Sequence, residues 1–299
     1  MSNVTLDPGE KLAAVNGVKL CYQTFGNPDD PALLLIMGLG AQMILWPEGF
    51  CDELAARGFW VIRFDNRDVG KSSKIEIPPL DIAKIMFSMK PGDKIDAPYL
   101  LADMAADSVG LLDVLGVAQA HIVGASMGGM IAQEIAIRHP RRVLSLTSIM
   151  STSGDPSLPP PSPHLASIFL APPPRTAEEY VEANVIAFRV LRGEGYPEEE
   201  ARDLALAARA AGRGFDPAGG ARQLTAILAS GSRRATLPTI KAPTLVIHAA
   251  DDPLVPLAAG EDTARCIPGA KLVVIDRMGH SLPGTVWKQI IDEIVRIAR

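Results

Sequence analysis

Three side chains that lie far apart in the sequence have the types needed for nucleophilic catalysis: Ser126, Asp252 and His280. A serine hydroxyl becomes a nucleophile when a histidine takes its proton, and a carboxylate holds that imidazole in the correct tautomer. Ser126 lies in a G-x-S-x-G pattern at residues 124–128, which is typical of a strained turn between a strand and a helix. By itself the pattern is weak, because ordinary strand-to-helix turns also match it.

The residues around Ser126 supply the context that this pattern needs. Residues 121–124 form an apolar run, and residues 130–136 carry apolar side chains at helical spacing, which predicts a strand, a sharp turn and a helix. Gly124 and Gly128 suit this turn because bulkier side chains would clash with the neighbouring strand and helix. The helix would direct its unpaired N–H groups and its positive dipole end toward an anion forming beside Ser126.

His280 is the expected general base. It follows a predicted strand within Met-Gly-His-Ser, so it lies on a loop at the carboxyl edge of the sheet, where Ser126 is expected. A lone histidine is more often structural, and the other four occupy less suitable places. His121 lies at the start of a strand and His139 at the end of a helix. His164 lies in a proline-rich stretch and His248 in the middle of a strand.

The expected acid follows the predicted strand at residues 244–249, where Asp251 and Asp252 are adjacent. Asp252 is the better candidate because Pro253 restricts the backbone of the residue before it. The other aspartate is expected to cap a helix, and Asp155 is a weaker third candidate for the acid. The resulting order of serine, aspartate and histidine is the order that accompanies the G-x-S-x-G turn.

Two backbone N–H groups are expected to form an oxyanion hole. One belongs to Met127, directly after the serine, and the other to Leu39, which stands between two glycines after an early predicted strand. A purely structural glycine turn at the end of that strand is the alternative. The loop is apolar, and its expected substrate-pocket residues are Gly38, Gly40, Met43 and Trp46. No metal site and no cofactor are expected.

Composition sets the outer limits of the fold. The chain has 299 residues, 47% hydrophobic and 21% charged, which is enough for one large α/β domain or a core with an inserted subdomain. A formal net charge of -5 argues against nucleic acid or an acidic membrane as the main partner.

The three cysteines are widely spaced and predict neither a disulfide framework nor a metal site. The N-terminal residues lack the apolar segment of a signal peptide, and the longest apolar run is too short to span a membrane, so a soluble, cytoplasmic protein is expected.

Strands and helices alternate through most of the chain, which predicts a parallel sheet built of crossover units. Asn16-Gly17 between two short alternating runs predicts a hairpin of residues 11–15 and 18–23. The further predicted strands cover residues 32–37, 60–65, 143–150, 244–249 and 271–275, besides the strand before Ser126. The predicted helices of this part cover residues 50–57, 99–115 and 286–297, besides the helix after Ser126.

Residues 153–237 interrupt this alternation, because they contain no convincing strand. A proline-rich stretch opens the segment and includes residues 172–174, and predicted helices follow at residues 177–192, 198–211 and 221–230. We interpret residues 153–237 as a helical lid over the carboxyl edge of the sheet, inserted into a core of residues 1–152 and 238–299. The alternative is a helical extension without contact to any site.

Over nearly its full length the chain resembles the α/β-hydrolase superfamily, and within it the aclacinomycin methylesterases and related carboxylesterases. The matching segments are residues 35–38, 46–47, 64–72, 99–107, 124–128, 252–253 and 278–280. The resemblance implies Ser126, Asp252 and His280 as the catalytic triad, and Leu39 and Met127 as the oxyanion amides. It also implies an eight-stranded, mostly parallel sheet flanked by helices, with an antiparallel second strand and a helical lid. Many relatives have a histidine where this chain has Met37, which changes the polarity of the pocket.

The resemblance also implies that Asp65, Arg67 and Gly70 form an ion-paired turn that supports the site.

Together the sequence features described above predict a serine hydrolase that cleaves small to medium apolar carboxylic esters through an acyl-enzyme. Lactonases, carbon–carbon bond hydrolases, perhydrolases and a non-catalytic small-molecule receptor remain alternatives. Ser126 argues against dehalogenases and epoxide hydrolases, which have an aspartate nucleophile. The expected partner is a small-molecule ester, and neither nucleic acid nor a membrane is expected as a partner. A homodimer is compatible with the sequence.

Overall fold

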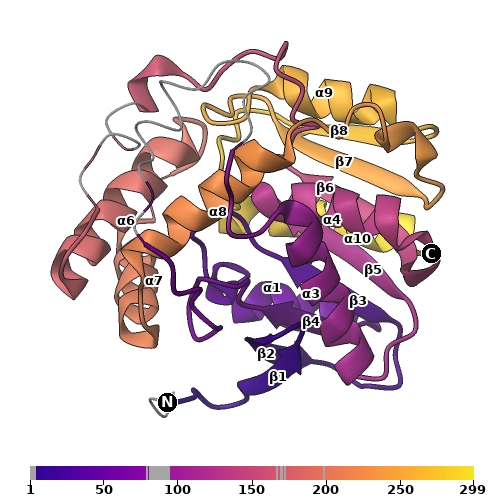
Figure 1. Cartoon of the computed structure of the whole chain (residues 1–299). Helices are drawn as coiled ribbons and strands as arrows, with labels where there is room; N and C mark the ends of the chain where they lie inside the picture. Colours follow the sequence, from indigo (N-terminus) through magenta and orange to yellow (C-terminus); the bar gives the residue numbers. More distant parts are fainter. Residues whose placement is uncertain are drawn as a thin grey trace.

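A central sheet runs through the whole protein in the computed structural model, which describes residues 5–78, 80, 95–165, 168, 171, 173–197 and 199–299 (Figure 1). Pro172 of the predicted proline-rich stretch and Glu198 of a predicted helix lie outside the described residues. The strands are β1 (Lys11–Val15), β2 (Val18–Phe25), β3 (Ala32–Ile36), β4 (Trp60–Phe64), β5 (Ala120–Ala125), β6 (Val143–Ile149), β7 (Thr244–Ala249) and β8 (Lys271–Ile275).

The sheet has eight strands in the order β1-β2-β4-β3-β5-β6-β7-β8. Strand β2 pairs antiparallel with β1 and β4, and every other neighbouring pair is parallel. This arrangement confirms the expected mostly parallel sheet with an antiparallel second strand. In the turn between β1 and β2, Asn16 has a φ of 44° and Gly17 a φ of 79°, as the predicted two-residue hairpin turn requires.

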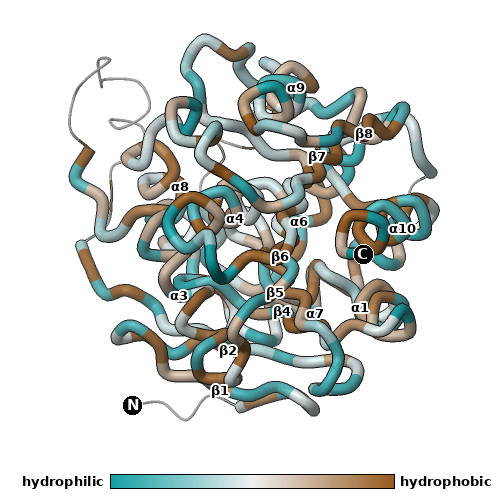
Figure 2. Tube along the Cα trace, turned by 90° about the vertical axis from the view of Figure 1, so that its right-hand side faces the viewer, coloured by the Kyte–Doolittle hydropathy of each residue, from teal (hydrophilic) through white to brown (hydrophobic). Residues whose placement is uncertain are grey.

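Helices cover both faces of the sheet, which explains why β3 is apolar along its whole length (Figure 2). Residues Leu34 and Ile36 of β3 pack in the apolar cluster that includes helices α3 (Leu101–Val114) and α4 (Met127–Arg138). Leu33 and Leu35 point to the opposite face, against α1 (Glu48–Ala56) and α10 (Trp287–Ala298). Helix α9 (Leu257–Cys266), which the sequence patterns did not predict, joins β7 to β8.

Between β6 and β7, the described part of the chain contains three further α-helices, and we call residues 153–237 the insertion (Figure 1). They are α6 (Ala177–Arg192), α7 (Glu200–Arg213) and α8 (Pro217–Ser230). The first has the predicted bounds, whereas α8 begins four residues before the predicted start. Asp216 caps α8 by accepting the N–H of Ala218 at 3.0 Å, and a proline follows at the first helical position, so the usual start signals were present.

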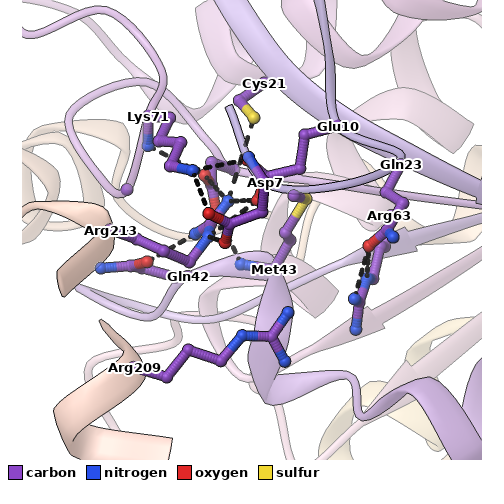
Figure 3. Close-up of polar contacts among 12 residues, drawn as sticks. Asp7, Glu10, Cys21, Gln23, Gln42, Met43, Arg63, Lys71, Arg209 and Arg213 are labelled. Atoms are coloured by element: carbon purple, nitrogen blue, oxygen red, sulfur yellow. Dashed lines mark hydrogen bonds and ion pairs between the residues drawn. The ribbon is translucent and has the colours of Figure 1, made fainter. Parts of the chain in front are cut away.

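The insertion is tied to the core by buried charges. The Arg213 side chain, at the end of α7, is 2% exposed and lies among acidic and polar groups of the core (Figure 3). Its guanidinium is 2.7 Å from the Glu10 carboxylate and 2.9 Å from the Asp65 carboxylate. Lys71 reaches both Glu10 and Asp7 at 2.8 Å. Because a buried charge without a partner strongly destabilises a protein, this network restricts how far α7 can move from the sheet.

No helix within the described ranges combines the length and the apolar character that crossing a membrane would require.

The charge network makes stability depend on pH. Burial raises the pKa of Glu10, but hydrogen bonds from Lys71, the Asp7 N–H and Arg213 outweigh it and place the pKa below its usual 4.5. A carboxyl whose pKa is lowered by folding stabilises the protein above the unfolded-state pKa and loses this effect as the pH falls through the folded-state pKa. We expect the free energy of unfolding to decrease as the pH is lowered below about 4.5. Glu10→Gln should have a smaller free energy of unfolding at pH 7, and this free energy should decrease less steeply with falling pH. Urea unfolding at pH 7 to 3 tests this; equal pH slopes would contradict it.

Candidate active site

The three side chains predicted from the sequence meet at the carboxyl edge of the sheet. Ser126 lies between β5 and α4, and its Oγ is 2.9 Å from Nε2 of His280. The other ring nitrogen of His280, Nδ1, is 2.7 Å from Oδ2 of Asp252. With the Nδ1 proton donated to Asp252, Nε2 is left as an acceptor for the Ser126 hydroxyl. Asp252 and His280 are only 6% and 9% exposed, so little water competes for these hydrogen bonds.

Ser126 has the strained backbone that the G-x-S-x-G pattern predicts, with φ 55° and ψ -122°. The surrounding backbone leaves no room for side chains at the two glycines. A Cβ on Gly124 would lie 2.0 Å from the Gly128 carbonyl oxygen, and a Cβ on Gly128 would lie 2.1 Å from the Ile36 carbonyl oxygen. The two glycines therefore let α4 approach the end of β3 closely.

The Asp252 carboxylate is bound by the loop that follows it, and the expected helix cap is absent, because α9 begins after Pro256 without a side-chain cap. Its Oδ1 accepts the N–H groups of Leu254 at 2.9 Å and Val255 at 2.8 Å, while Oδ2 faces His280. These backbone donors orient the carboxylate toward the imidazole. Asp251 is exposed, and Asp155 is 2.8 Å from Arg234 on the surface, so neither belongs to this arrangement.

Two of the remaining histidines have buried partners away from Ser126. Nδ1 of His121 is 2.8 Å from the Ser145 hydroxyl, and Nε2 of His248 is 2.8 Å from the Val255 carbonyl oxygen. Burial lowers the pKa of both imidazoles, which keeps them neutral at pH 7. Both side chains are structural, as expected.

The loop that carries His280 rests on the insertion. The His280 N–H donates to the Leu191 carbonyl at 2.6 Å, and the Gly279 N–H donates to the Arg192 carbonyl at 3.1 Å, both in the last turn of α6. A Cβ on Gly279 would lie 2.3 Å from the Arg192 carbonyl oxygen. The insertion therefore contacts the His280 loop directly. No sequence pattern indicated this contact, because it depends on how α6 packs.

The turn after β3 lies against Ser126, where an oxyanion hole was expected. The Ala41 N–H donates to the Gly38 carbonyl at 3.3 Å, and Gly40 has a φ of 67° at the third position of the turn. A Cβ on Gly38 would lie only 3.0 Å from the Cβ of Ser126. On the other side, Met127 is the first residue of α4, and its N–H has no acceptor within the helix. The amides of Leu39 and Met127 thus lie on elements adjacent to Ser126.

Two of the four expected pocket residues are core residues instead. The Met43 and Trp46 side chains have no exposed surface, so neither lines an open pocket. A short 3₁₀ helix at Met43–Leu45 turns these side chains inward. Met43 packs in a small cluster with Cys21, and the Trp46 ring lies 5.3 Å from the Phe50 ring. Gly38 is buried, whereas Gly40 is half-exposed in the turn beside Ser126.

The segment after β4 contains Asp65, Arg67 and Gly70, and Asp65 contacts the chain that follows the turn after β3. Oδ1 of Asp65 accepts the Met43 N–H at 2.7 Å and so holds the chain that follows the turn after β3. Arg67 forms two hydrogen bonds to the Asp107 carboxylate, at 2.7 and 2.8 Å. Gly70 has a φ of 53°, and a Cβ there would lie 2.2 Å from Asp65 Oδ2.

A groove of about 690 Å³ runs between α6 and α7. It contains none of the predicted site residues and is lined by Ala177, Glu178, Val181, Glu182, Val185, Ile186, Arg189, Leu204, Ala208, Ala211 and Gly212. Within the described ranges, no three or more His, Cys, Asp or Glu side chains are grouped so that they could hold a metal ion.

Comparison with known proteins agrees with the fold and the site. A family model described as the α/β-hydrolase fold matches residues 31–284, and the chain belongs to this family. It is 35% identical to the rhodomycin D methylesterase DnrP of Streptomyces peucetius over 91% of this chain and 92% of that protein. It is 30% identical to a putative carbamate hydrolase, RutD of Variovorax paradoxus, over 88% of this chain and 89% of that protein.

Solved structures include an enol-lactonase from Burkholderia xenovorans, with a TM-score of 0.73 and 26% identity over 96% of this chain and 99% of that one. These likenesses confirm the predicted fold class and family, and they support a hydrolase.

The close approach at Gly128 generates a prediction about stability. We expect Gly128→Ala to lower the free energy of unfolding by about 1–3 kcal/mol, because the methyl group would overlap the Ile36 carbonyl. Gly220→Ala is the matched control, since this helical glycine of α8 has open space around its Cα. It should raise stability by about 0.5–1 kcal/mol, as alanine does in a helix. Urea unfolding measures both, and equal effects of the two substitutions would contradict the close approach.

Proposed function

We propose that the protein is a serine hydrolase that cleaves carboxylic esters through an acyl-enzyme. The observation that carries the proposal is the hydrogen-bonded series of Ser126, His280 and Asp252, with distances of 2.9 and 2.7 Å. The similarity to a rhodomycin D methylesterase supports an ester as the substrate class.

Each step follows from the arrangement of these groups. Ser126 Oγ attacks the ester carbonyl carbon while Nε2 of His280 takes the hydroxyl proton, and Asp252 stabilises the imidazolium. The N–H groups of Leu39 and Met127 bind the negative oxygen of the tetrahedral intermediate. When the intermediate collapses, His280 returns the proton to the departing alcohol and Ser126 keeps the acyl group. Water, deprotonated by His280, then releases the carboxylic acid and restores the serine hydroxyl.

The surroundings of Ser126 favour apolar esters of small to medium size. Leu39, whose amide belongs to the proposed oxyanion hole, has an apolar and partly buried side chain, and Met37 stands where many relatives have a histidine. We assign residues 153–237 as a lid over this edge of the sheet, since the last turn of α6 contacts the His280 loop. A lactonase on the same three side chains is the second candidate, favoured by the 26% identity to an enol-lactonase.

Removing the nucleophile tests the mechanism. We expect Ser126→Ala to abolish the hydrolysis of p-nitrophenyl esters above the background rate, because the variant lacks the hydroxyl that lies 2.9 Å from His280 Nε2 and would form the acyl-enzyme. Steady-state kinetics of both proteins, together with labelling by a fluorophosphonate, provide the measurement. Equal rates in wild type and Ser126→Ala would refute the proposal. Esters of increasing acyl length and a set of lactones, measured in parallel, separate the two candidate functions.

The role of the acid has a matched control one residue away. Asp252→Asn should lower kcat by on the order of 10⁴, because an amide stabilises the wrong tautomer of the imidazole. Asp251→Asn changes an exposed neighbour with the same chemistry and should leave kcat near that of wild type. Equal kcat values for the two variants would show that Asp252 is not the acid.

A further inference from the structure

The turn that carries the Leu39 amide is held from the insertion by one buried side chain, Gln223 of α8. The Gly40 N–H donates to Gln223 Oε1 at 2.8 Å, and Gln223 Nε2 donates to the Arg67 carbonyl at 2.8 Å. The side chain has no exposed surface. One carboxamide thus satisfies a donor on the turn after β3 and an acceptor on the segment after β4.

The direction of the Gln223 amide is determined by its two partners. An N–H group requires an acceptor and a carbonyl requires a donor, so the flipped amide would lose both hydrogen bonds. Arg67 is itself fixed by its two hydrogen bonds to Asp107, which makes its carbonyl a firm anchor. Gln223 therefore links the turn beside Ser126 to a backbone position of the core that is itself held in place.

The hydrogen bonds within the turn show what this contact achieves. Among its N–H groups, that of Ala41 is bound to the Gly38 carbonyl and that of Gly40 to Gln223. Without Gln223, the Gly40 N–H would become a second free donor, and the turn would lose the contact that fixes its orientation. Within the described residues the Leu39 N–H forms no hydrogen bond, so with Gln223 present it is the donor left available to an oxyanion beside Ser126.

A second glutamine binds the insertion from the residue just after the turn. Gln42 is buried, and its Nε2 donates to the carbonyls of Ala210 at 2.8 Å and Gly214 at 3.0 Å, at the end of α7. The turn and the residue that follows it are thus both bound to the insertion.

We propose that Gln223 is a positioning residue for the oxyanion hole: by binding the Gly40 N–H, it selects the Leu39 N–H as the donor and fixes its direction. The proposal rests on the proposed function of Ser126 as the nucleophile. Gln223 does not touch the reacting atoms, and it acts through the orientation of the turn.

Gln223→Met tests this role, because methionine matches the size of glutamine and forms neither hydrogen bond. We expect kcat for a p-nitrophenyl ester to fall about 10- to 100-fold, less than the loss of a whole oxyanion donor, while KM changes less than threefold. The affinity for an alkyl trifluoromethyl ketone should fall by a similar factor, because its adduct with Ser126 places a negative oxygen in the hole. A destabilised variant that stays folded under the assay conditions would leave this inhibition constant unchanged, because only loss of the binding-competent fraction raises it.

Gln133→Met is the matched control. Gln133 has no exposed surface, and it also joins the core to the end of the insertion, with Oε1 accepting from Arg233 at 2.9 Å. Its partners lie away from the turn after β3, so its variant should share the loss of stability but keep the wild-type inhibition constant.

The outcomes separate this inference from the function on which it rests. If wild type far exceeds Ser126→Ala but Gln223→Met keeps kcat and the inhibition constant within twofold of wild type, Gln223 has no positioning role. An equal effect of Gln223→Met and Gln133→Met on the inhibition constant would also overturn it. If wild type and Ser126→Ala do not differ, the proposed function fails, and the role of Gln223 fails with it.

Discussion

The close contact between the first turn of α4 and the end of β3 is the constraint on which the site depends. It requires glycine at position 128, where any side chain would overlap the Ile36 carbonyl. The same contact places Ser126 at the start of α4 next to Gly38, at the start of the turn after β3. The proposed nucleophile, Ser126, and the two amides proposed to stabilise negative charge therefore come from two elements whose separation the backbone itself fixes.

The insertion completes the site from two directions. The last turn of α6 accepts hydrogen bonds from the backbone of Gly279 and His280, and α8 binds Gly40 through Gln223. These contacts join the His280 loop and the turn after β3 to one helical segment between β6 and β7. Displacement of the insertion would therefore disturb the proposed base and the proposed oxyanion donors together.

Buried ion pairs hold the insertion against the core, and they account for several of the charged residues in the interior of the protein. Arg213 of α7 pairs with Glu10 and Asp65, and Asp65 in turn accepts the Met43 N–H. Arg222 of α8 pairs with Asp68 at 2.7 Å. Paired charges in a buried position contribute little net stability, but they penalise every arrangement in which they separate. Such a network therefore favours one position of the insertion against the sheet.

The sequence by itself determined the features that depend on neighbouring residues. The hairpin at Asn16 and Gly17, the bounds of β7 and the turn at Ser126 all follow from local patterns, since turn chemistry and side-chain periodicity act within a few residues. The meeting of Ser126, Asp252 and His280 at one place could also be expected from the sequence, because parallel strands bring their carboxyl ends to one edge of the sheet.

Only the tertiary structure decided the features that depend on packing between distant segments. Gly40 and Gln223 are 183 positions apart, and nothing in the local pattern of either residue indicates the other. Met43 and Trp46 have the apolar character expected of a pocket, and the 3₁₀ helix at Met43–Leu45 turned them into the core. The physical reason is that composition fixes which groups prefer burial or a hydrogen bond, whereas the partner is chosen by the three-dimensional path of the chain.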